Sequence, residues 1–264
     1  MLVENNNEVI IASTYSHART IEEEIVEAAR QSNFGDEAVF ALRLSLEEAL
    51  TNAIHHGNAD DSGKKIQVSY SVTPQAVKVR IADEGPGFNP EQVPDPTTEE
   101  RLEVPSGRGI LLMRAYMDQV EFNEQGNEVI LIKYAQDATG KTETLHGGNL
   151  KLTNEIHDEH AVLKLSGSAD MAEAQALGAF LAEQLTQGRK SLLLEISGVS
   201  FISSMGLGAL IQAHNQCRKA GGSLLVVAPQ PAVRRVLYTT RLDRFFELFD
   251  TLDEAKARMG RSTT

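Results

Sequence analysis

The sequence has little of what several classes of protein require. It contains a single cysteine, Cys217, so no disulfide can form within the chain, and a reducing compartment is expected. No apolar run is long enough to cross a bilayer, and the first residues lack the basic and apolar parts of a signal peptide. These absences predict a cytoplasmic protein that does not use a membrane.

Positive charge is also scarce. Lysine and arginine number 25 against 37 aspartates and glutamates, which gives a formal net charge of -12. An acidic chain repels phosphate backbones and anionic lipid, so the composition predicts no direct binding of nucleic acid. A G-x-S-x-G motif and a cysteine–histidine cluster of zinc spacing are absent too, which argues against a serine hydrolase triad and a structural zinc site.

The length of 264 residues and a change of pattern along the chain predict two α/β domains. We expect the first domain to cover residues 1–136. Residues 137–148 are polar and rich in glycine and threonine, which is typical of a linker. Residues 149–264 alternate strand and helix patterns, which predicts a mostly parallel sheet with right-handed crossovers.

Two features of the first domain affect the interpretation of its site. Thr20 and Glu23 have the spacing of a capping box, which predicts a helix that begins after Thr20, and a second helix is expected over residues 36–56. Residues 84–106 form a long irregular stretch with five prolines. A loop of that length inside a compact domain is usually functional.

Three short motifs in the first domain carry the chemistry of a nucleotide site. Glu48 and Asn52 are four residues apart, so both project from one face of the expected helix. The sequence 83–87, DEGPG, ends a strand, and 107–109, GRG, opens a helix. Glycines let backbone approach a ligand closely, and a helix N-terminus suits phosphate. The Asp83 carboxylate can accept a hydrogen bond from an exocyclic amine, and the amide oxygen of Asn52 suits Mg²⁺.

The order and spacing of these motifs resemble the Bergerat-type ATPase fold of histidine kinases, type II topoisomerases and anti-sigma factor serine kinases. The resemblance covers roughly residues 8–136 and is greatest to the anti-sigma factor serine kinases, through LEEALTNAIHHG and GRGILLM. It implies an α/β sandwich, with a mixed sheet and helices on one face, that binds ATP and Mg²⁺. Kinases of this kind usually pair, so it also implies a homodimer through this domain.

The resemblance assigns roles residue by residue. Asn52 would hold Mg²⁺ against the triphosphate, and Asp83 would contact the adenine amine. Glu48 would orient or deprotonate the attacking hydroxyl. Arg108 would either meet the terminal phosphate or lie as a solvated arginine of the lid. Four glycines would shape the pocket and its lid: Gly85, Gly87, Gly107 and Gly109.

Two adjacent serines stand where an apolar strand passes into a helix, in SFISSMGLGAL. Taken alone, either Ser203 or Ser204 could be the N-cap. The second half resembles the STAS domain of anti-sigma factor antagonists over about residues 149–258, through ISGVSFISS, GLGALIQAHNQCRKAGGSLLVVAP and RLDRFFELFDTLDEA. In that family the serine three residues before the leucine of Gly-Leu accepts a phosphoryl group. The resemblance therefore implies Ser204 rather than Ser203 as the phosphoacceptor, with Ser203 in the place of a common aspartate.

Together the two resemblances imply a regulatory protein of a partner-switching pathway that controls a sigma factor or another effector. In one hypothesis the first domain phosphorylates a serine, either Ser204 of this chain or its counterpart in a separate STAS antagonist. In another the protein binds ATP without turnover and docks partners through its STAS domain. Pro105, where some of these kinases carry arginine, motivates that alternative, as does Ser203. A third hypothesis is a degenerate dimerisation scaffold that does not bind ATP.

Overall fold

The computed structural model describes residues 7–135, 150–156 and 160–260. The predicted linker at 137–148 lies outside these residues. The chain forms two compact units, each of two stretches: an N-terminal unit, Met1–Pro94 with Gly107–Leu145, and a C-terminal unit, Asp95–Ser106 with His146–Thr264. None of the helices in the described ranges has the length and apolar character needed to cross a bilayer.

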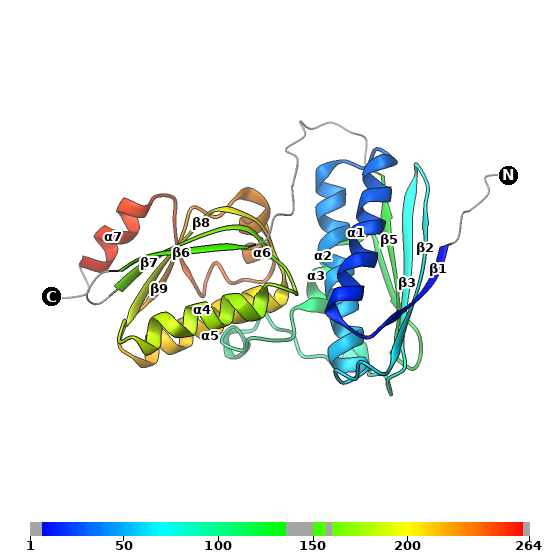
Figure 1. Ribbon diagram of the computed structural model, residues 1–264, viewed down its shortest axis with the longest axis horizontal. Helices are drawn as coiled ribbons and strands as arrows, with labels where there is room; N and C mark the ends of the chain where they lie inside the picture. The colour runs from blue at the N-terminus through cyan, green and yellow to red at the C-terminus, as the bar shows by residue number, and fades with distance from the viewer. Residues whose placement is uncertain (1–6, 136–149, 157–159, 261–264) are drawn as a thin grey trace. The chain divides into compact units, whose positions relative to one another are not determined.

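The N-terminal unit is a five-stranded sheet with helices α1, α2 and α3 on one face (Figure 1). The strand order is β1-β2-β3-β5-β4. The strands are β1 (Asn7–Ala12), β2 (Lys65–Val72), β3 (Ala76–Asp83), β4 (Gln119–Phe122) and β5 (Glu128–Tyr134). The helical elements are α1 (Tyr15–Gln31), α2 (Asp36–Asn52), the π-helical turn η1 (Ala53–Gly57), the 3₁₀ turn η2 (Pro90–Gln92) and α3 (Gly109–Tyr116).

The predicted α/β class and the one-sided helical layer are confirmed, but the strand directions differ from the expected mixed sheet. Each strand pairing of the N-terminal unit is antiparallel. The reason lies in the connections. The hairpin of α1 and α2 reverses the chain between β1 and β2, and tight turns join β2 to β3 and β4 to β5.

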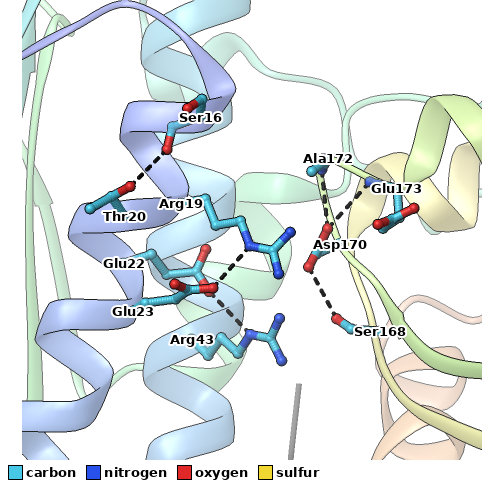
Figure 2. Close-up of polar contacts among 10 residues, drawn as sticks. All are labelled: Ser16, Arg19, Thr20, Glu22, Glu23, Arg43, Ser168, Asp170, Ala172 and Glu173. Atoms are coloured by element: carbon cyan, nitrogen blue, oxygen red, sulfur yellow. Dashed lines mark hydrogen bonds and ion pairs between the residues drawn. The ribbon is translucent and has the colours of Figure 1, made fainter. Parts of the chain in front are cut away.

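Helix α1 begins earlier than the sequence predicts. Its N-cap is Thr14, whose hydroxyl accepts a hydrogen bond from the His17 amide at 3.5 Å. Thr20 lies inside the helix and donates to the carbonyl of Ser16 at 3.1 Å (Figure 2). The predicted capping box at Thr20 is therefore wrong, because no glycine or proline stops the helix between Thr14 and that residue.

Two ion pairs on α1 show which charges hold the helical hairpin. Glu23 pairs with Arg19 at 2.9 Å along the surface of α1, where such pairs contribute little. Glu22 instead reaches Arg43 of α2 at 3.1 Å, and its side chain is only 3% exposed (Figure 2). Removing one partner from a buried pair costs on the order of 3–5 kcal/mol, so the second pair fixes α1 against α2.

The C-terminal unit contains a five-stranded sheet of order β10-β9-β8-β7-β6. Only β6 and β7 pair antiparallel among its described strands, so the predicted mostly parallel sheet is confirmed. The strands are β6 (Lys151–Ile156), β7 (His160–Ala169), β8 (Ser191–Ile202), β9 (Leu224–Val227) and β10 (Glu247–Phe249). The helical elements are η3 (Glu99–Arg101), α4 (Ala174–Thr186), α5 (Ser204–Lys219), α6 (Pro231–Thr239) and α7 (Leu252–Gly260).

The central strands of this sheet are buried on both faces, as expected for parallel strands, whereas the antiparallel edge strand β6 is mostly exposed. Val162, Leu193 and Leu225 are paired neighbours across β7, β8 and β9, so they share one face. Ala255 of α7 packs on them with no exposed surface. Figure 1 shows α4 and α5 along the opposite face of the sheet. The apolar runs in these strands follow from this two-sided cover.

Helix α7 is an element that the sequence analysis did not predict. It begins with a reciprocal capping box, the pattern wrongly assigned to Thr20. The Thr251 hydroxyl accepts from the Glu254 amide at 3.3 Å, and the Glu254 carboxylate accepts from the Thr251 amide at 3.2 Å. Thr251-x-x-Glu254 was therefore a usable sequence signal.

We predict that Thr251→Ala will loosen α7 by about 0.5–2 kcal/mol, because it removes the acceptor for the Glu254 amide. Hydrogen exchange of the amides in 252–260 measures this loss. Lys256→Ala is the matched control, since Lys256 is exposed on the same helix. Equal exchange in both variants would show that the capping box does not stabilise α7.

Candidate functional site

The helix that carries the first motif changes its geometry directly after the motif. The sequence predicts one helix over 36–56, whereas α2 ends at Asn52 and the chain continues as the π-helical turn η1. Single π turns within helices are frequently found at functional sites. Glu48, one turn before Asn52, is 2% exposed, so its carboxylate lies within the fold rather than in solvent.

The first and third motifs meet at Gly109, the first residue of α3. A Cβ atom at Gly109 would lie 2.7 Å from Oε2 of Glu48 and 3.4 Å from Nδ2 of Asn52. The distance to Asn52 is an ordinary contact, but the distance to Glu48 is too short, so a side chain at position 109 would displace the Glu48 carboxylate. The structure therefore brings Glu48, Asn52 and Gly109 together, as the sequence predicts.

The second motif meets the turn η1, directly after the helix that carries the first motif, in the same way. A Cβ atom at Gly57 would lie 2.3 Å from Cγ of Asp83, and one at Gly85 would lie 2.1 Å from the carbonyl oxygen of Gly57. Asp83 accepts a hydrogen bond from the Gly85 amide at 2.8 Å. Burial raises the pKa of Asp83 above its usual value of 3.8, and the Gly85 amide opposes that rise. Gly57 is thus a part of the site that is not among the residues predicted from the sequence.

Two asparagines that the sequence analysis missed hold this region in place. Asn58 is fully buried; its side chain accepts from the Glu84 amide at 3.0 Å and donates to the Lys65 carbonyl at 3.0 Å. Asn127 donates to the Asp83 carbonyl at 3.2 Å. Each asparagine directly follows a glycine, and asparagine in a turn commonly bonds nearby backbone, which was the available signal.

The other two predicted glycines adopt left-handed backbone. Gly87 has φ of 77°, and a Cβ atom there would lie 2.0 Å from the carbonyl oxygen of Gln125, so it packs against the turn between β4 and β5. Gly107 has φ of 93° and no atom within 4 Å of its Cβ position. Gly107 is therefore required by conformation rather than by crowding.

Arg108 occupies the N-cap position of α3. Its surface is 1% exposed, which contradicts the alternative of a solvated lid arginine. Burial lowers the pKa of Arg108 to about 10, so the guanidinium stays protonated at neutral pH. A buried cation at the start of this helix suits an anionic ligand.

The two serines of the C-terminal unit have separate positions. Ser203 is the N-cap of α5: its hydroxyl accepts from the Gly206 amide at 3.2 Å and donates to the Ala169 carbonyl at 3.2 Å. It is 1% exposed. Ser204 is the first residue of α5 and is half-buried. The hydroxyl proton of Ser203 is thus committed to Ala169, and the serines are not interchangeable.

Comparison with known families divides the chain in the same order. Residues 11–133 match the histidine kinase-like ATPase domain, and residues 151–255 match the STAS domain. The first match includes all three nucleotide motifs. The second includes the loop between β8 and α5, where the two serines lie.

Individual relatives fall into two classes. Serine-protein kinase RsbW of Oceanobacillus iheyensis is 29% identical over 113 residues, which are 40% of this chain and 72% of that protein. Anti-sigma-F factor antagonist RsfB of Mycobacterium tuberculosis is 32% identical over 109 residues, 40% of this chain and 87% of that protein. The crystal structure of an anti-sigma factor antagonist from Mycobacterium paratuberculosis is 33% identical, covers 42% of this chain and 94% of its own, and has a TM-score of 0.39.

A kinase and an antagonist are therefore similar to one and the same chain. The antagonist RsfB is matched over most of its own length. The protein belongs to the STAS family of anti-sigma factor antagonists, and residues 11–133 of the same chain match the histidine kinase-like ATPase domain.

Proposed function

We propose that the protein is an ATP-dependent serine kinase that phosphorylates a STAS domain, its own or that of a separate antagonist, in a cytoplasmic partner-switching pathway. The convergence of Glu48, Asn52 and Gly109 carries the proposal. It brings together a candidate base, a candidate metal ligand and a backbone position without a side chain, which a phosphate can approach closely. The similarity to a serine-protein kinase and to antagonists supports the choice of reaction and substrate. A sigma factor or another effector would be the regulated partner.

The residues of the site fit Mg-ATP. Asn52 would hold Mg²⁺, which neutralises charge on the β- and γ-phosphates when bound. Asp83 would accept a hydrogen bond from the adenine amine, which its buried, restrained carboxylate suits. Gly107 and Gly109 would admit the phosphates close to the backbone of α3, where free amides point outward.

The proposed reaction is an in-line transfer to a serine hydroxyl. Oγ of Ser204 attacks the γ-phosphorus of ATP, the bond to the bridging oxygen breaks, and ADP leaves with that bond's electron pair. Glu48 receives the hydroxyl proton as the general base. Arg108 stabilises negative charge on the phosphoryl group. The products are phosphoserine, ADP and a protonated Glu48, which releases its proton to solvent.

Phosphorylation at Ser204 would change binding without unfolding the STAS domain. The phosphate would sit at the N-terminus of α5, where helix amides favour an anion. A partner docked over the same loop would meet a new charge of about -1.5 to -2. A local change of charge would thus switch the partner between bound and released states.

We predict that Asp83→Asn will weaken ATP binding about 10- to 150-fold, because a hydrogen bond to a charged group contributes about 1.5–3 kcal/mol. Isothermal titration calorimetry measures the affinity. The asparagine can still accept from the Gly85 amide, so the fold is retained. Asp61→Asn is the matched control, since Asp61 is exposed and only caps the amide of Gly63. Equal ATP affinity in both variants would contradict the role of Asp83.

We predict that Mg-ATP will add one phosphate at Ser204, and that Ser204→Ala will abolish it. Ser203→Ala will keep the phosphate but lower the free energy of unfolding by about 0.5–2 kcal/mol, because it removes the N-cap of α5. Site-resolved mass spectrometry and urea unfolding measure the two effects. Glu48→Gln controls for contaminating kinases, since it should abolish incorporation as well.

One outcome would contradict the choice of acceptor, and another would contradict the kinase proposal itself. The first is phosphate on the Ser204→Ala chain at Ser203. The other is no phosphate on the wild-type chain or on an added STAS antagonist, although ATP binds. The second outcome would favour a nucleotide-responsive binding module, in which ATP changes partner affinity without turnover.

A further inference from the structure

The 95–106 segment, which joins the second and third nucleotide motifs in the sequence, is a folded part of the C-terminal unit. Oδ1 of Asp95 accepts from both the amide and the hydroxyl of Thr97, at 2.8 and 2.7 Å. The Thr98 carbonyl accepts from the Leu102 amide at 3.1 Å and closes a short helical turn. These bonds give the segment a defined shape of its own.

Glu103 attaches the 95–106 segment to α5 through two polar contacts. Its carbonyl oxygen accepts from Nδ2 of Asn215 at 3.0 Å. Its carboxylate forms an ion pair with Arg218 at 2.7 Å. Both side chains of the pair are more than half exposed, so the pair adds little binding free energy. Its main effect is to fix the position of the 95–106 segment along α5.

A steric contact beside Glu103 is more specific. A Cβ atom at Gly208 of α5 would lie 2.8 Å from the carbonyl oxygen of Pro105, and the three nearest atoms to it all belong to Pro105. Gly206 differs, because a Cβ atom there would meet Ala169 and Ile202 of the STAS domain itself, each at 2.9 Å. Packing within the STAS domain therefore explains why a side chain does not fit at position 206, whereas packing against the 95–106 segment explains why one does not fit at position 208.

The contacted residues form one stripe along α5. At 100° per residue, Ser204, Gly208, Asn215 and Arg218 lie within about 80° of one another. The stripe runs about 21 Å along the helix axis at 1.5 Å per residue. It therefore begins at the predicted phosphoacceptor and continues through Gly208, Asn215 and Arg218, which lie against Glu103 or Pro105.

We propose that the 95–106 segment is the recognition element for helix α5 of the STAS domain. Glu103 and Pro105 of this segment contact the stripe that begins at Ser204. The absence of a side chain at Gly208 leaves room for Pro105. Only Ser106 separates Pro105 from Gly107, so recognition of α5 is covalently adjacent to the third nucleotide motif. We also expect a STAS domain with a side chain at position 208 to be phosphorylated slowly. This expectation rests on the proposed kinase function.

Gly208→Ala in the full-length protein tests the contact by hydrogen exchange without nucleotide. We expect the amides of the 95–106 segment to exchange about tenfold faster or more, because the new Cβ overpacks against Pro105. The amides of α5 should not exchange faster, since alanine favours a helix more than glycine does. Unchanged exchange in the 95–106 segment would overturn the proposal.

Gly178→Ala in α4 is the matched control. It makes the same substitution in a neighbouring helix, where the nearest atom to the new Cβ is that of Ala209 at an ordinary 3.8 Å. Exchange in the 95–106 segment should match the wild type. An equal rise in both variants would mean that the effect does not arise from Pro105, and would also overturn the proposal.

A charge exchange gives a second test that does not depend on the folding of a Gly208 variant. Glu103→Arg and Arg218→Glu should each accelerate exchange of the 95–106 segment by up to about fivefold. The two substitutions together should restore the wild-type rate, because the pair re-forms with its signs reversed. A double variant that exchanges as fast as the single variants would contradict the pairing.

The kinase function and the recognition of α5 by the 95–106 segment can be contradicted independently of each other. If Mg-ATP adds no phosphate to any STAS domain, the kinase function is wrong, while the exchange results still report the contact. If Gly208→Ala loosens the 95–106 segment but phosphate appears on Ser204 at the wild-type rate, the contact exists and its role in substrate recognition is overturned. The initial rate of phosphate incorporation distinguishes these cases.

Discussion

The nucleotide site depends on the approach of Gly85 to the carbonyl of Gly57, because a side chain on either residue would separate the second motif from the π-helical turn η1 that follows α2. A Cβ atom at Gly85 would lie 2.1 Å from that oxygen. Gly109 repeats the arrangement against Glu48. Gly57, Gly85 and Gly109 therefore act through the absence of a side chain, which lets three distant stretches of chain converge.

Much of this arrangement could be predicted from the sequence, because it is encoded in short motifs. The spacing of Glu48 and Asn52, the two glycine motifs and the α/β pattern are local properties. The meeting of Gly57 with Gly85 is not, since it depends on how a helix end and a strand end pack. Strand direction in the N-terminal sheet likewise depends on the α1–α2 hairpin rather than on any strand's own residues.

The two capping-box patterns show the same limit. Thr20-x-x-Glu23 has the required residues, yet it lies inside α1, because the residues before it extend the helix back to Thr14. Thr251-x-x-Glu254 has the same pattern and does begin a helix. The 95–106 segment is a further case: its prolines predict an irregular loop, but its contact with Gly208 joins residues about a hundred positions apart and leaves no local signal.

The hydrogen bonding of Ser203 has an electrical consequence. An aspartate in this position could accept from the Gly206 amide, but an ionised one could not donate to Ala169 as the serine does, and it would place a permanent negative charge beside Ser204. With serine as the cap, the loop has no charge of its own at the start of α5. A phosphate there would be an anion without an anionic neighbour in the cap, so the two states of the loop differ by the presence of charge and not merely by its amount.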